Sequence, residues 1–329
     1  MNDMKKPTVA GYSTQDEITI SSLKVRFDAP GVESKRIFAN GRMQVRILVF
    51  VVAVNQSGAP VPLQYFPDLI STRLIRFHDG QPLAQDAYAG VPVPGWSVSV
   101  LENRYAHDMP GTTPATGGTG GTTGTPLEFW VSSSEIGQLH IAAEVTVQGK
   151  VYRSNNTVNP DGTMNNESIV VSAERSPEYS HELFSWRSHE IFGAWNGVRL
   201  FRYDLGLYLG GQQVKLIDWD THQYGESGRW PVKFCYTGML TSLRGSRSFT
   251  GIMLPVRAAE VDVVGVRLPV IQRVGELVAF KGIPPVYKFS REELRLEPFF
   301  FTALDEFGNT HHLSLVVDIQ SNEFLLVRG

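Results

Sequence analysis

Apolar and polar residues alternate along most of this chain with a period of two, which is typical of half-buried β-strands. The alternating positions include Ile18, Ile20, Leu23, Val25 and Phe27, and the alternation returns over residues 45–51, 141–147, 261–270 and 313–327. After Leu48 the chain becomes apolar on both strand faces, which favours a central strand of a sandwich. Turns rich in Gly, Asn and Asp separate these runs at spacings that fit a sandwich or barrel. The pattern therefore predicts an all-β protein.

Local signals in the second half of the chain refine this picture. Gly265 interrupts an apolar run and predicts a bend. Residues 320–322 separate the last two apolar runs, which predicts a C-terminal hairpin with a short loop. Helical signals are few: residues 290–294 carry a capping-box pattern that Pro298 soon ends, so we expect one or two helical turns there at most. Residues 65–70 are a second candidate for a helical turn.

The chain has 329 residues, and the usual size of a domain then predicts two domains. Aromatic residues become dense after residue 174, which places the boundary there. We expect a β-sandwich over residues 1–174, with an insertion over residues 63–127, and a second β-rich, aromatic-rich domain over residues 175–329. Gly, Thr and Pro fill nearly all of residues 110–126, without any large apolar residue, which predicts a long flexible loop.

Two blocks of the first domain carry a further pattern. Residues 38–41 (Phe-Ala-Asn-Gly) lead into the apolar run of residues 43–61, and Gly137 lies in a turn within residues 129–152. These blocks resemble bacterial immunoglobulin-like domains of the invasin type, although Asn55 stands where that family usually has Asp. The resemblance implies an immunoglobulin-like sandwich that acts as a spacer, adhesion or assembly module, and it implies no catalytic residues. For the second domain no family resemblance is identified.

The charge and composition narrow the classes of partner and compartment. The net charge is −3 and no long basic run exists, which argues against nucleic acid as a partner. The most apolar stretch, residues 45–54, is far shorter than the roughly 20 residues of a membrane-spanning helix. Residues 1–6 are polar and basic without a following apolar run, so we expect cytoplasmic synthesis without a signal peptide. The single cysteine, Cys235, excludes an intrachain disulfide and is expected to be a small buried residue.

The strongest local group of chemically active residues is in the segment 216–222. If this segment is a strand, Asp218, Asp220 and His222 share one of its faces. Two carboxylates and an imidazole at this spacing are candidate ligands of a divalent cation. The alternative is a solvated strand face, with Trp219 on the other face packed inward. No other cofactor is predicted.

The same segment also allows an enzymatic hypothesis. Asp218 and Asp220, joined by Glu226 from the following turn, could act as the acid and base of a polysaccharide hydrolase. This hypothesis requires a groove lined by Trp219 and Trp230 around the carboxylates, with the pKa of one carboxyl raised.

Tryptophans are concentrated in the second domain, where Trp186, Trp195, Trp219 and Trp230 fall within 45 residues. Aromatic density is first a sign of core packing. Trp195 and Trp230 lie at predicted turns, where their rings would be partly exposed, and Arg229 is adjacent to Trp230. Exposed aromatic and Arg side chains bind sugars or anchor protein interfaces. Trp195, Trp219, Trp230 and Arg229 are therefore the candidate binding residues, with core packing as the alternative.

The sequence as a whole favours a non-enzymatic structural or binding protein. We expect a subunit of an extracellular or virion-type assembly, or an adhesion module, that forms homo-oligomers. Five features support this expectation: the β-rich domains, the single cysteine, the absent signal sequence, the Gly/Thr-rich loop and the strands that are apolar on both faces. A secreted β-rich toxin or glycan-binding protein is one alternative, and the hydrolase using Asp218, Asp220 and Glu226 is another.

Overall fold

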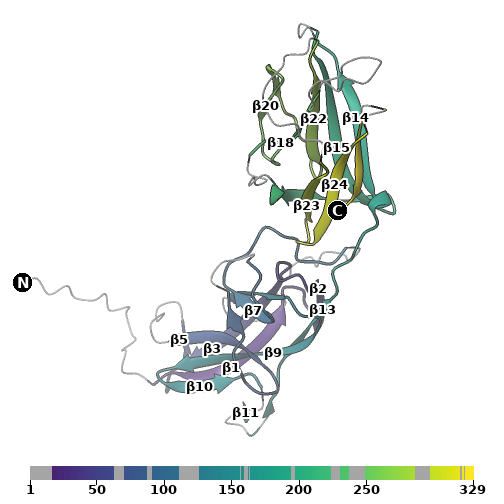
Figure 1. Cartoon of the computed structure of the whole chain (residues 1–329). Helices are drawn as coiled ribbons and strands as arrows, with labels where there is room; N and C mark the ends of the chain where they lie inside the picture. Colours follow the sequence, from purple (N-terminus) through teal and green to yellow (C-terminus); the bar gives the residue numbers. More distant parts are fainter. Residues whose placement is uncertain are drawn as a thin grey trace, which may run out of the picture. The chain divides into compact units, whose positions relative to one another are not determined.

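A computed structural model of the chain shows β-strands throughout its described parts (Figure 1). The residues described are 17–62, 70–86, 91–110, 126–155, 157–158, 162, 164–193, 197–223, 230–236, 249–285, 297–318, 321 and 323–329. Apart from the short 3₁₀ helix η3 (His181–Leu183), the regular secondary structure of these residues is all strand. The all-β prediction is therefore confirmed. None of the described segments forms an apolar helix of membrane-spanning length.

Two kinds of predicted local structure lie outside the described residues. They are residues 111–125 of the Gly/Thr-rich loop predicted over 110–126, and the candidate helical turns at residues 65–70 and 290–294, of which only Ile70 is described, as the first residue of a strand. The chain divides into two compact units between Ser176 and Pro177, close to the boundary predicted after residue 174.

The first sheet of unit 1 has six strands in the order β1-β3-β8-β7-β6, with β4 paired to β3 (Figure 1). Its strands are β1 (Thr19–Phe27), β3 (Val45–Val54), β4 (Pro60–Val61), β6 (Ala84–Gln85), β7 (Trp96–Ser99) and β8 (Leu127–Ser133). Strands β1 and β8 flank β3 on its two sides, and both pairings are antiparallel. The run that is apolar on both faces is thus a central strand of this sheet, as predicted.

The second sheet of unit 1 is built around β9, which pairs with β5 on one side and with β13 and β10 on the other. Its strands are β2 (Ser34–Phe38), β5 (Ile70–Arg76), β9 (Gly137–Val147), β10 (Lys150–Arg153) and β13 (Ile169–Glu174). A small hairpin of β11 (Thr157–Val158) and β12 (Met164–Asn165) follows β10. Residues 63–127, expected as an insertion, supply β5 to this sheet and β7 to the other, so this section is part of the sandwich.

The outer face of β3 is also covered, which explains why this strand is apolar on both faces. The ring of His107 lies against Trp130 of β8, the strand next to β3, at a centroid distance of 4.5 Å. Close to His107 in the sequence, the backbone N–H of Asn103 donates to Oε1 of Gln44 over 3.0 Å. Leu48 and Phe50, on this face, are buried at 5% and 4% exposure.

Unit 2 contains two larger sheets and one separate hairpin. The six-stranded sheet has the strand order β14-β15-β22-β19-β18, and β16 also pairs with β15. Its strands are β14 (Phe184–Ile191), β15 (Arg199–Leu209), β16 (Gln212–Val214), β18 (Val232–Tyr236), β19 (Thr250–Met253) and β22 (Leu277–Ile283). The four-stranded sheet consists of β17 (Leu216–Asp220), β23 (Phe299–Asp305), β24 (Thr310–Asp318) and β25 (Glu323–Arg328). The predicted C-terminal hairpin is confirmed by the antiparallel pairing of β24 with β25.

The remaining hairpin joins β20 (Glu260–Val263) to β21 (Val266–Pro269). Its turn residues Val264 and Gly265 have φ of 56° and 78°, the left-handed values of a tight hairpin turn. The backbone N–H of Gly265 donates to Oδ1 of Asp262 over 2.9 Å. The bend predicted at Gly265 is therefore the turn of this hairpin.

Aromatic side chains fill the space between the two sheets of unit 2. Phe234 of β18 stacks on Phe299 of β23 at 5.0 Å and meets Phe324 of β25 at 4.9 Å. Tyr203 of β15 contacts Phe324 at 5.3 Å. Cys235 is also buried, at 1% exposure. The aromatic density of the second half of the sequence thus includes the core of a sandwich.

Candidate functional site

The acidic segment predicted as a candidate site forms strand β17, which pairs with β23. Asp218 and Asp220 alternate along it with Trp219, whose side chain is only 1% exposed. The indole Nε1 of Trp219 donates to the backbone oxygen of Leu254 over 2.7 Å, and its ring meets Phe299 edge-on. Trp219 is therefore part of the core and has almost no surface to offer to a ligand.

The two carboxylates of β17 make short-range hydrogen bonds to the backbone. Oδ1 of Asp218 accepts from the N–H of Trp219, and Oδ1 of Asp220 accepts from the N–H of Thr221. His222 is exposed and follows the end of the strand. In the described part of the chain, no three His, Cys, Asp or Glu side chains are grouped as metal ligands would be. Cation binding by Asp218, Asp220 and His222 stays a prediction.

The other predicted binding residues are placed differently from Trp219. Trp230 is 69% exposed, as its position at a turn predicted. Trp195, Arg229 and Glu226 lie outside the described residues. Since Trp219 packs into the core, it cannot line the groove around Asp218 and Asp220 that the hydrolase hypothesis requires.

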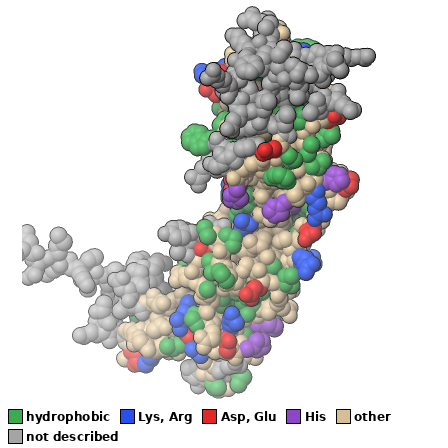
Figure 2. Space-filling model, viewed as in Figure 1, with side chains coloured by type: hydrophobic (Ala, Val, Ile, Leu, Met, Phe, Trp, Pro, Cys, Tyr) green, Lys and Arg blue, Asp and Glu red, His purple; other side chains and the backbone are tan. Residues whose placement is uncertain are grey.

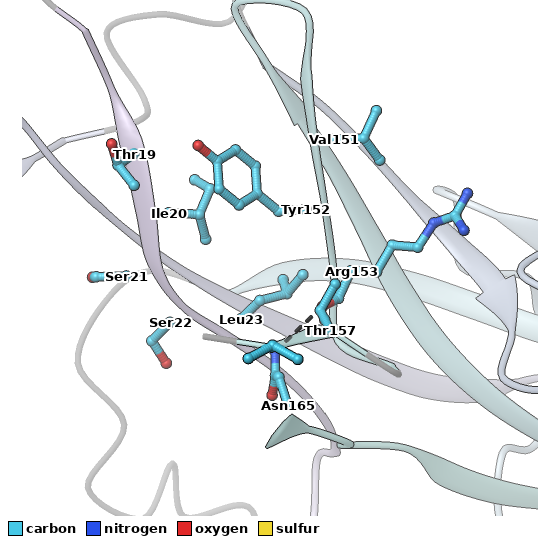
Figure 3. Close-up of a pocket in the computed structure, with 11 residues that line it drawn as sticks. Thr19, Ile20, Ser21, Ser22, Leu23, Val151, Tyr152, Arg153, Thr157 and Asn165 are labelled. Carbon is cyan, nitrogen blue, oxygen red and sulfur yellow. Dashed lines mark hydrogen bonds between the residues drawn. The ribbon is translucent and has the colours of Figure 1, made fainter. Parts of the chain in front are cut away.

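A hollow in unit 1 lies on the open side of the sandwich between β1 and β10 (Figure 3). We call it the β1 groove. Its volume is about 340 Å³, and its lining residues are Thr19, Ile20, Ser21, Ser22, Leu23, Val151, Tyr152, Arg153, Thr157, Val158 and Asn165. These residues come from two segments more than a hundred positions apart, so the groove depends on the fold of the whole sandwich.

The β1 side of the groove is shaped by a β-bulge. The pairing of β1 with β3 shifts register between Ile20 and Ser22, and the hydroxyl of Ser21 donates to the backbone oxygen of Val52 over 3.1 Å. The extra residue changes the phase of the strand. Ile20 and Leu23 are consequently both buried although they are three positions apart. Figure 3 shows both side chains between β1 and β10, where they form the apolar floor.

The β10 side of the groove is set by a tight turn after β9. Gln148 and Gly149 have φ of 47° and 79°, which suits a two-residue hairpin. The ring of Tyr152 on β10 points across the groove towards Ile20 (Figure 3).

The groove itself is uncharged, because its one charged lining residue is engaged outside it. Arg153 points away from the groove (Figure 3), and its Nε donates to Oε2 of Glu144 over 2.8 Å. The Nε of Arg73, on β5, donates to the other oxygen of Glu144, also over 2.8 Å. Glu144 is only 2% exposed, so this pair of arginines is what balances its buried charge.

The β11–β12 hairpin forms the rim of the groove. The amide of Asn165 and the hydroxyl of Thr157 both donate to the backbone oxygen of Arg153, which holds the hairpin beside β10. Val158 and Met164 pair with each other in this hairpin and are 66% and 65% exposed. The rim thus presents apolar side chains to solvent next to the groove.

Two strand edges border the β1 groove. In the described residues, β1 pairs only with β3 and β10 pairs only with β9, so each has an edge that no described strand occupies. Edge strands offer backbone N–H and C=O groups to an added strand. An uncharged, partly apolar groove with such edges is suited to an extended peptide. Sequence reasoning missed this site, although the change of phase between Ile20 and Leu23 was its visible signal.

Surface charge gives no second candidate on the face in view. Figure 2 shows Lys and Arg interspersed with Asp and Glu there, without one basic patch.

Comparison with known proteins gives no family: no protein-family model matches this chain, and no curated protein matches it. The resemblance of residues 43–61 and 129–152 to immunoglobulin-like domains of the invasin type therefore stays a prediction.

Proposed function

We propose that this chain is a non-enzymatic structural or binding protein that works as a subunit of an extracellular or virion-type assembly. In this proposal the β1 groove of unit 1 receives an extended segment of another subunit. The single observation that carries the proposal is the uncharged groove between two strand edges, with Ile20 and Leu23 as its floor.

Three features of unit 1 support strand addition as the mode of contact. The groove runs along five residues of β1, so an added strand can form several backbone hydrogen bonds with this edge. Alternate side chains of the added strand would then point into the groove. The exposed Val158 and Met164 on the rim add apolar area that a partner would cover. The lining residues other than Arg153 are uncharged, so a neutral partner segment loses no charge solvation when it docks.

The experiment is the mass of the protein in solution over a wide range of concentration, measured by light scattering after size exclusion. We expect a defined oligomer whose fraction rises with concentration. Val158→Lys places a charge on the exposed rim and is expected to weaken association by about tenfold or more. Ile136→Lys is the matched control, because Ile136 is also exposed, at 61%, and does not line the groove.

The outcomes separate the proposal from its alternatives. A wild-type protein that is monomeric at every concentration would contradict self-assembly and would favour a monomeric toxin or glycan-binding protein. Equal weakening by Val158→Lys and Ile136→Lys would show that the groove has no special part in association.

A further inference from the structure

The residues that precede β1 enter the fold at one end of the β1 groove. The side chain of Lys150 forms an ion pair with Glu17, and the backbone N–H of Ile18 donates to Oε1 of Gln148 over 3.1 Å. Both contacts fix the start of β1 beside the β9–β10 turn. Residues 1–16, which come before the described part of the chain, therefore connect to the protein directly next to the groove.

Within this preceding segment, residues 8–14 have the composition of a strand that could occupy the groove. Their sequence, Thr-Val-Ala-Gly-Tyr-Ser-Thr, is uncharged and contains the strand-favouring residues Val, Tyr and Thr. Pro7 precedes it, and charged residues lie outside it at Lys6 and Asp16. A neutral segment matches a groove whose only charged lining residue, Arg153, points away from it.

The length of this segment also fits the groove of a neighbouring molecule. Sixteen extended residues reach at most about 55 Å, and five residues of a strand occupy about 17 Å. Filling the groove of its own chain would require the segment to reverse direction immediately before β1. The residues there, Gln15, Asp16 and Glu17, lack the Gly or Asn-Gly that tight hairpin turns use.

We infer that residues 8–14 of one copy of this chain bind as an added strand in the β1 groove of a second copy. The inference rests on the proposed function, for which it names the partner and the contact. Each copy offers one segment and one groove, so the contact is heterologous and can build a ring or a filament.

The first test changes the segment and leaves the groove intact. Val9→Pro removes a backbone donor from the segment and is incompatible with a paired strand, and deletion of residues 1–16 removes the segment entirely. We expect both changes to weaken self-association by more than about tenfold. Asn2→Pro, outside residues 8–14, is the matched control and is expected to leave association unchanged.

The second test traps the contact between two copies. One copy carries Tyr12→Cys and a differently tagged copy carries Ser22→Cys, on β1. The native Cys235 is buried and stays out of the reaction. We expect a disulfide-linked heterodimer of the two tagged copies, and none when Ser188→Cys, an exposed position of unit 2, replaces Ser22→Cys.

The outcomes distinguish this inference from the proposed function. Self-association that survives deletion of residues 1–16 would overturn the inference while the assembly function stands. A wild-type protein that never associates would overturn both. A disulfide that forms only when Tyr12→Cys and Ser22→Cys are on the same chain would show that the groove is filled from within one molecule, which also overturns the inference.

Discussion

Raising the pH from about 9 to 11 is expected to reduce the free energy of unfolding of unit 2 by about 3 kcal/mol. Burial raises the pKa of Cys235 to about 12, and burial followed by repulsion from Asp305 raises the pKa of Tyr179 to about 12. Burial and a hydrogen bond to Glu323 also raise the pKa of Tyr203. A group with a raised folded-state pKa stabilises the fold fully below its unfolded pKa, and that stability is lost as the pH rises towards the folded value.

One buried group acts in the opposite direction. Burial lowers the pKa of Lys281, whose side chain is 1% exposed and lies over the ring of Phe201 at 4.4 Å. Lys281 therefore adds stability as the pH rises from its lowered pKa towards the ordinary value. Three groups (Cys235, Tyr179 and Tyr203) lower the free energy of unfolding as the pH rises, and only Lys281 raises it. We therefore expect a net loss of stability.

Denaturant titrations at pH 7, 9 and 11 measure this loss. Cys235→Ala removes the thiol, so above pH 9 we expect the free energy of unfolding of the variant to fall less steeply than that of the wild type, by about 1 kcal/mol per pH unit. The comparison uses the pH dependence within each protein, so the cavity left by the substitution does not affect it. Parallel pH profiles of the two proteins would contradict burial of the thiol.

Trp219→Ala is expected to destabilise unit 2 by about 3–5 kcal/mol, because it removes a large buried ring. It also leaves the backbone oxygen of Leu254 without the indole donor that now lies at 2.7 Å. Trp219→Phe keeps most of the volume but loses this donor, and is expected to destabilise by about 1–3 kcal/mol. Urea denaturation followed by circular dichroism measures both effects.

Trp230→Ala is the matched control, since Trp230 is 69% exposed whereas Trp219 is 1% exposed. We expect this surface substitution to change stability by no more than about 0.5 kcal/mol. If Trp219→Ala were as mild as Trp230→Ala, the assignment of Trp219 to the core would be wrong.

The fold class could be predicted from sequence because alternation and turns are local signals. The break in alternation between Ile20 and Leu23 corresponds to the bulge at Ser21, and Gly265 marks the turn of the β20–β21 hairpin. The last two apolar runs form the paired strands β24 and β25. The pairing of strands is not local. Nothing near β5 or β7 in the sequence shows that they complete the two sheets of unit 1, so this section looked like an insertion.

The candidate sites show a second limit of sequence reasoning. The pattern around β17 correctly placed Trp219 on the face opposite Asp218 and Asp220, but alternation cannot tell whether an aromatic residue binds a ligand or packs in a core. Alternation also does not show whether a charged residue within a strand is exposed or buried. Glu144 and Lys281 are both buried, and their charged partners come from other strands, which the sequence pattern does not show.

For the same reason the sequence shows only one sign of the β1 groove, the break in alternation between Ile20 and Leu23. Its floor comes from Ile20 and Leu23, and its far side from Tyr152. Only the completed sandwich brings these residues together, and only the sheet order shows that β1 and β10 each have an unoccupied edge in the described structure.

Hydrogen exchange of the backbone amides of β1, compared at low and high protein concentration, tests the role of the groove most directly. If another subunit adds a strand there, the amides of residues 19–23 exchange more slowly at high concentration, while those of the already paired β9 change little. If the protein associates but residues 19–23 exchange equally fast at both concentrations, the β1 groove is not the contact between subunits.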